Sequence, residues 1–101
     1  MKYKARDFLL LKDVDNVLVT CRNFLAGEYV DIDGESVSVD QDTPAGYKIA
    51  RFEIENGELI VKCGMTIGEC TKKTAKGSQL HIHNMDSLYI ASHLKGGARY
   101  G

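Results

Sequence analysis

Short apolar stretches separated by glycine turns dominate this chain. Apolar and polar residues alternate with a period of two at Glu35–Val39 and Tyr47–Phe52, and β-branched residues are frequent in Val17–Cys21 and Glu58–Cys63. Both patterns are typical of β-strands. The 3.6-residue period of an amphipathic helix is nearly absent. We therefore predict an all-β protein, with further short strands in these segments: Phe8–Leu11, Tyr29–Ile32 and Gln79–Asn84.

Two other segments are predicted differently. Gly64 and Gly68 bracket a stretch that we expect to be a short loop or a bulge. Asp86–Leu94 is compatible with either a strand or a short helix.

A glycine turn followed three residues later by an apolar strand residue occurs four times. The turns are Ala26-Gly27, Ala45-Gly46, Asn56-Gly57 and Lys76-Gly77, and the apolar residues that follow them are Val30, Ile49, Ile60 and Leu80. Glycine readily adopts the positive φ that tight turns need. Because the spacing is uneven, a solenoid is not indicated. The recurrence instead predicts a compact body of short, bent strands.

Length and charge narrow the possibilities further. At 101 residues, with 44% hydrophobic and 27% charged residues, the chain is typical of one globular domain, which we place at residues 1–94 with a flexible tail at 95–101. A net charge of -1 argues against a nucleic-acid partner. No apolar run approaches the roughly 20 residues that cross a membrane, and Phe8–Leu11 is too short for a signal peptide. We expect a cytoplasmic protein.

The three cysteines are expected to be free thiols. Cys21, Cys63 and Cys70 are odd in number and form no Cys-x-x-Cys pair. Cys21 and Cys63 lie in predicted apolar strands, so we expect them to pack in the core. Cys70 lies near two lysines that favour its thiolate, but a thiol without a catalytic role is the more economical interpretation.

The strongest candidate chemistry lies in the predicted strand Gln79–Asn84. Side chains two apart on a strand share a face, so His81 and His83 are expected side by side. Imidazole titrates near neutral pH and suits general acid–base catalysis. The alternative is two exposed polar residues on a solvated face. We predict no metal site on this chain, because two ligands are too few and His93 and the cysteines are not suitably spaced.

Four further residues are candidates for binding a carboxylate or hydroxyl group. Lys48 and Lys62 supply charge, and Tyr47 and Asn84 supply neutral donors. The structural alternative is surface lysines and a turn-capping asparagine, and that alternative is favoured for Lys62.

Several motifs in order resemble the N-terminal SAF domain of the altronate and galactarate dehydratase family, between about Phe8 and Asn84. They are Asp15-Asn16-Val17, Leu25-Ala26-Gly27-Glu28, Asp42-Thr43-Pro44-Ala45-Gly46-Tyr47-Lys48, Gly57-Glu58, Lys62-Cys63-Gly64, Ile67-Gly68 and His81-Ile82-His83-Asn84. The resemblance implies a β-clip fold and hydro-lyase chemistry on sugar acids. A related enzyme, sulfolactate sulfo-lyase, carries this domain as a separate small subunit.

The large catalytic portion of the family is missing after the histidine strand, so the resemblance implies either a fragment or a separate subunit. We favour the separate small subunit of a lyase that eliminates water, or sulfite, from an anionic hydroxy acid. His81 and His83 are then catalytic, and Tyr47, Lys48 and Asn84 bind substrate. The chain itself needs no cofactor, and a large catalytic subunit holds a divalent metal, iron or manganese; a homo-oligomer is also compatible. The alternative is a non-catalytic carbohydrate-binding or assembly module.

One position departs from the family pattern. The family usually has histidine after the Pro-Ala-Gly turn, where this chain has Tyr47. Tyrosine, with an ordinary pKa near 10, is a poorer base at neutral pH.

Overall fold

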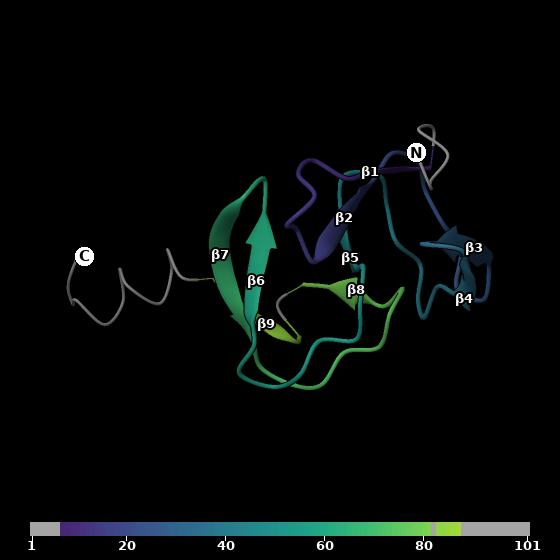
Figure 1. The fold of residues 1–101 in the computed structure, drawn as a ribbon. Coiled ribbons are helices and arrows are strands. Elements are labelled where there is room, and N and C mark those ends of the chain that lie inside the picture. The colour runs from purple at the N-terminus through teal and green to yellow at the C-terminus, as the bar shows by residue number, and fades with distance from the viewer. Residues whose placement is uncertain (1–6, 82, 88–101) are drawn as a thin grey trace.

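The structure is a computed structural model that describes residues 7–81 and 83–87. These residues form strands, turns and bends and contain no helix, so the predicted all-β fold is confirmed (Figure 1). Within the same residues, no helix is long and apolar enough to cross a membrane. The strands are β1 (Phe8–Leu9), β2 (Val17–Thr20), β3 (Tyr29–Ile32), β4 (Glu35–Ser38), β5 (Lys48–Ala50), β6 (Leu59–Lys62), β7 (Met65–Cys70), β8 (Gln79–Leu80) and β9 (Met85–Ser87).

A central antiparallel sheet with the order β1-β2-β5-β8 separates two hydrophobic cores. Neighbouring residues on a strand face opposite sides, so Leu18 enters one core and Val17 the other. The first core includes residues of hairpin β3–β4, and the second includes residues of β6–β7. Figure 1 shows the two hairpins on opposite sides of the central sheet.

Residues 20–50 and 50–81 repeat the same local structure. Phe24 and Thr43 exchange two backbone hydrogen bonds, as Ile54 and Thr74 do; the first members of the two pairs are 30 residues apart and the second members are 31 apart. The extra residue enters at an irregularity in the pairing of β6 with β7. Core residues correspond in the same way, pairing Phe24, Val30, Val39 and Ile49 with Ile54, Ile60, Cys70 and Leu80.

The four predicted glycine turns are confirmed, and each of the two repeats contains two of them. Gly27, Gly46, Gly57 and Gly77 have φ between 87 and 91°. The apolar residue three positions after each of them is buried. The recurrence seen in the sequence is therefore a structural duplication.

The Asp15-Asn16 dipeptide fastens hairpin β6–β7 to the rest of the chain. The Asp15 carboxylate is 1% exposed and accepts hydrogen bonds from the backbone N–H groups of Lys12, Cys63 and Gly64, at 3.1, 2.7 and 2.8 Å. The Asn16 side chain donates to Leu59 O and accepts from Val61 N, both at 2.8 Å. The amide thus occupies the outer edge of β6 as a neighbouring strand would.

The predicted end of one strand was wrong, whereas the bulge predicted between Gly64 and Gly68 is confirmed. Strand β8 ends at Leu80, and a hydrogen bond from Asn84 N to His81 O closes a turn after it. The segment between Gly64 and Gly68 belongs to strand β7 and contains the irregularity of the hairpin, because Ile60 pairs with Gly68 and Val61 with Thr66, which leaves Ile67 unpaired. Of Asp86–Leu94, strand β9 includes the first two residues, while positions 88–94 and the predicted tail at 95–101 lie outside the described residues.

The cysteine predictions also need correction. Cys21 and Cys63 are exposed, and Cys63 sits with φ of 55° in the turn between β6 and β7. Cys70 is instead the buried one, where its thiol lies 3.0 Å from Lys72 O. All three are free thiols, as predicted.

Replacing Asp15 should destabilise the fold strongly. Asp15→Ala leaves three backbone donors without their acceptor, so we expect a loss of about 3 kcal/mol or more in the free energy of unfolding. Urea denaturation followed by circular dichroism measures the loss. Asp13→Ala, at an exposed carboxylate nearby, is the control and should change stability by less than about 0.5 kcal/mol. Equal effects of the two substitutions would contradict the fastening role of Asp15.

Candidate functional site

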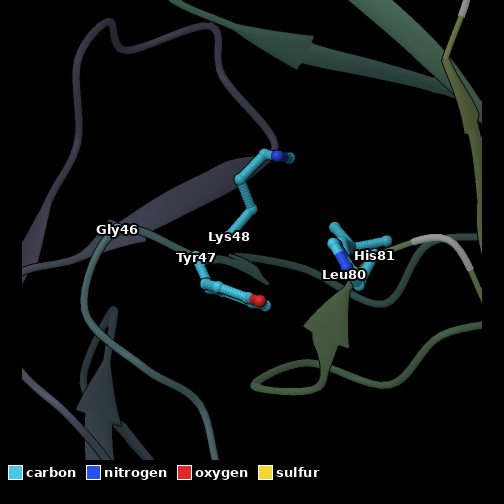
Figure 2. Close-up of a pocket in the computed structure, with 5 residues that line it drawn as sticks. All are labelled: Gly46, Tyr47, Lys48, Leu80 and His81. Carbon is cyan, nitrogen blue, oxygen red and sulfur yellow. The ribbon is translucent and has the colours of Figure 1, made fainter.

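A pocket of about 240 Å³ lies where strand β5 begins and strand β8 ends, and it is open to solvent on one side. Its lining consists of Gly46, Tyr47, Lys48, Leu80 and His81 (Figure 2). Tyr47 and Lys48 leave the chain in opposite directions, and the Tyr47 ring extends toward His81. The pocket therefore brings together two of the predicted substrate-binding residues and one of the predicted catalytic histidines.

The contact between Tyr47 and His81 follows from the register of the sheet. Lys48 pairs with Leu80 across β5 and β8, so Tyr47 and His81 are the next opposing residues beyond the ladder. Their ring centroids are 5.0 Å apart and the rings are tilted by 39°. The phenol and the imidazole are thus held together at the mouth of the pocket.

The internal repeat shows what is unusual about this place. The pairing of β5 with β8 corresponds to the pairing of β2 with β5 one repeat earlier. At that earlier position the residues equivalent to Tyr47, Lys48, Leu80 and His81 are Val17, Leu18, Ile49 and Ala50, and all four are buried. The pocket therefore lies at positions that form hydrophobic core in the other copy.

Lys48 is a half-buried cation in this pocket. Burial lowers the pKa of Lys48 below its ordinary value, and the positive charge of Lys62 lowers it further. Among the described residues, no carboxylate forms an ion pair with Lys48. A desolvated amine without a counter-ion is suited to binding an anion.

His83 reaches the same part of the molecule by a different route from the one predicted. The two histidines do not share a strand face, because the chain turns after Leu80. His83 Nε2 instead lies 3.4 Å from Gln41 Nε2, so both imidazoles border the segment from Gln41 to Lys48. Both histidine residues are exposed.

Asn84 is buried and its amide is fully used inside the chain. It is 3% exposed, donates to Thr74 Oγ1 and Gln79 O, and accepts from the backbone N–H of His81. The amide therefore points into the protein, where it fixes the turn that carries His81. This predicted substrate-binding residue is not one of the residues that line the pocket.

Within residues 7–81 and 83–87, no three His, Cys, Asp or Glu side chains are grouped so that they could hold a metal ion. The groups present are imidazoles, a phenol and an amine. They can exchange protons with a ligand, donate hydrogen bonds and attract negative charge.

Comparison with known proteins identifies the family. The model of the altronate/galactarate dehydratase SAF domain matches residues 6–88. The chain belongs to this family. It is 34% identical over 79 residues to the altronate dehydratase of Bacillus subtilis (strain 168) and 31% identical over 77 residues to that of Escherichia coli (strain K12). The matches cover 78% and 76% of this chain but 16% of each relative, so the SAF domain spans about one sixth of these enzymes.

Substitution of Asn84 should loosen the histidine turn. Asn84→Ala removes both amide donors and the acceptor for His81 N, so we expect a loss of about 2 kcal/mol in stability. The proton contacts between the rings of Tyr47 and His81 should also weaken in nuclear Overhauser spectra. Asp86→Ala, at an exposed side chain two residues further on, should leave both unchanged. An intact ring contact in Asn84→Ala would show that the amide does not position His81.

Proposed function

We propose that this SAF domain is the small subunit of a hydro-lyase of the altronate/galactarate dehydratase type. It acts on a sugar acid together with a large catalytic subunit that corresponds to the rest of the relatives' length. The observation that carries the proposal is the pocket itself, whose lining combines a half-buried amine that forms no ion pair with any described residue, a phenol and an exposed imidazole. Family membership and the altronate dehydratase relatives support the choice of substrate class.

The groups at the pocket suit an elimination of water. The reaction breaks a C–H bond beside the carboxylate and a C–O bond one carbon further, so one proton must be taken up and another delivered to the leaving hydroxyl. His81 and His83 are the candidates for these two proton transfers. Lys48 would hold the carboxylate, and the Tyr47 hydroxyl would donate a hydrogen bond to the substrate.

The divalent metal expected for this chemistry, iron or manganese, is assigned to the large subunit. The described part of this chain provides no grouped ligands for it. The domain would close over the metal-bearing surface and contribute its histidines from outside.

A chimera tests the proposal. The matching segment of the Bacillus subtilis altronate dehydratase is replaced by this chain, and turnover of altronate is measured. This chain alone should be inactive, and the chimera should be active. In the chimera, His81→Ala or His83→Ala should lower turnover by a factor of about 10² or more, the usual scale for loss of an acid or base.

Lys72→Ala in the chimera is the matched control, because Lys72 is exposed and is not one of the residues that line the pocket. It should preserve activity. Chimeras that lack either histidine and still turn over altronate at the parental rate would refute the catalytic roles. That result would favour the carbohydrate-binding or assembly module.

A further inference from the structure

We propose that Lys62 and Lys48 together form a carboxylate-binding subsite, in which Lys62 restricts the pocket to acidic ligands. The inference rests on the proposed function only in taking a sugar acid as the ligand. It gives a role to Lys62, which the sequence pattern alone favours as an ordinary surface lysine.

The strand geometry directs the two amines toward the same space. Ile60 packs in the second core, and Lys62 shares its face of β6 because the two are separated by one residue. The extra residue of this hairpin lies in β7, so the alternation along β6 is unbroken. Lys62 therefore faces the central sheet.

Lys48 lies on the face of that sheet which β6 covers. It pairs with Leu80, and paired residues share a face. Leu80 belongs to the same core as Ile60. Both side chains are half-buried, Lys48 on the covered face of the sheet and Lys62 on the face of the hairpin that covers it.

This arrangement is unfavourable until an anion binds. Within the described residues, neither Lys48 nor Lys62 takes part in an ion pair, whereas Lys73 and Lys76 do. The charge of Lys62 depresses the pKa of Lys48 in addition to the effect of burial. In addition, Lys48 occupies the position that corresponds to the buried Leu18 in the other repeat. A carboxylate between the two amines would neutralise both charges and relieve this repulsion.

The subsite also orients the ligand. Tyr47 and His81 line the same pocket from the opposite side of β5 and β8, so a sugar acid with its carboxylate on the two lysines would extend past the end of these strands to bring a hydroxyl-bearing carbon to them. A polyol of equal length can accept hydrogen bonds from the lysines but has no negative charge to neutralise theirs. The subsite thus discriminates by charge rather than by size.

Calorimetric titration of the full chain tests the subsite. Galactarate and altronate supply carboxylates, and galactitol is the uncharged counterpart. We expect the two acids to bind and galactitol not to bind. Lys62→Met and Lys48→Met keep the aliphatic stem but remove the charge, and each should weaken galactarate binding about tenfold or more. Lys72→Met, at an exposed lysine, should bind as the parent does.

Carbon NMR of the lysine Cε atoms gives an independent readout. Lys48 should titrate below its ordinary value in the free chain, and its pKa should rise both in Lys62→Met and on addition of galactarate. Circular dichroism confirms that the variants are folded. The subsite is refuted if galactarate does not bind, if galactitol binds equally well, or if Lys62→Met changes neither the affinity nor the Lys48 titration.

The experiments distinguish a failure of the lyase proposal from a failure of the lysine subsite. Binding that depends on Lys62, together with an inactive chimera, would retain the subsite and reject the lyase assignment. An active chimera, together with binding that is indifferent to Lys62, would reject the subsite alone.

Discussion

The buried carboxylate of Asp15 is the constraint on which the arrangement of the two halves depends. A polar group in a protein interior is tolerated only when hydrogen bonds replace its water, and Asp15 obtains three from backbone N–H groups. Two of these donors lie in the turn of hairpin β6–β7, so the Asp15 side chain holds that hairpin against the segment leading into β2. Since Lys62 is adjacent to this turn, the same contact determines where Lys62 meets the central sheet.

The duplication explains how a small domain acquires a polar pocket. Between β2 and β5, the repeated pattern closes into hydrophobic core through Val17, Leu18, Ile49 and Ala50. Between β5 and β8 the equivalent places hold Tyr47, Lys48, Leu80 and His81, and β8 is the last strand of the central sheet. With no further strand beside it, this end of the sheet can admit solvent and a ligand. The pocket is thus a core position that the final repeat leaves open.

Much of the fold could be predicted because its signals are local. Alternation and β-branched residues locate the strands, and Gly27, Gly46, Gly57 and Gly77 locate the turns that the duplication repeats. The end of β8 could not be predicted, because the turn after it is held by the Asn84 amide, which bonds Gln79 O within the same run and Thr74 Oγ1 ten residues earlier. A run such as Gln79–Asn84 looks like a strand until these side-chain hydrogen bonds are known.

In the candidate site, too, some residues could be identified from the sequence and others only from the folded structure. Tyr47, Lys48 and His81 were identified from the sequence and do line one pocket. The partnership of Lys62 with Lys48 was missed because it depends on a hairpin folding back over the sheet. An alignment of the two repeats would have given a clue, since it places Lys48 opposite the core residue Leu18.

Asn16 has a consequence for how this domain behaves among its own copies. An exposed strand edge offers unpaired backbone groups to any other extended chain, which is a common route to aggregation. Asn16 occupies that edge of β6: its side-chain amide bonds Leu59 O and Val61 N, and its backbone N–H bonds Val61 O. The β6 flank of the sheet that contributes Lys62 is thereby closed to strand addition by one residue, without an additional strand.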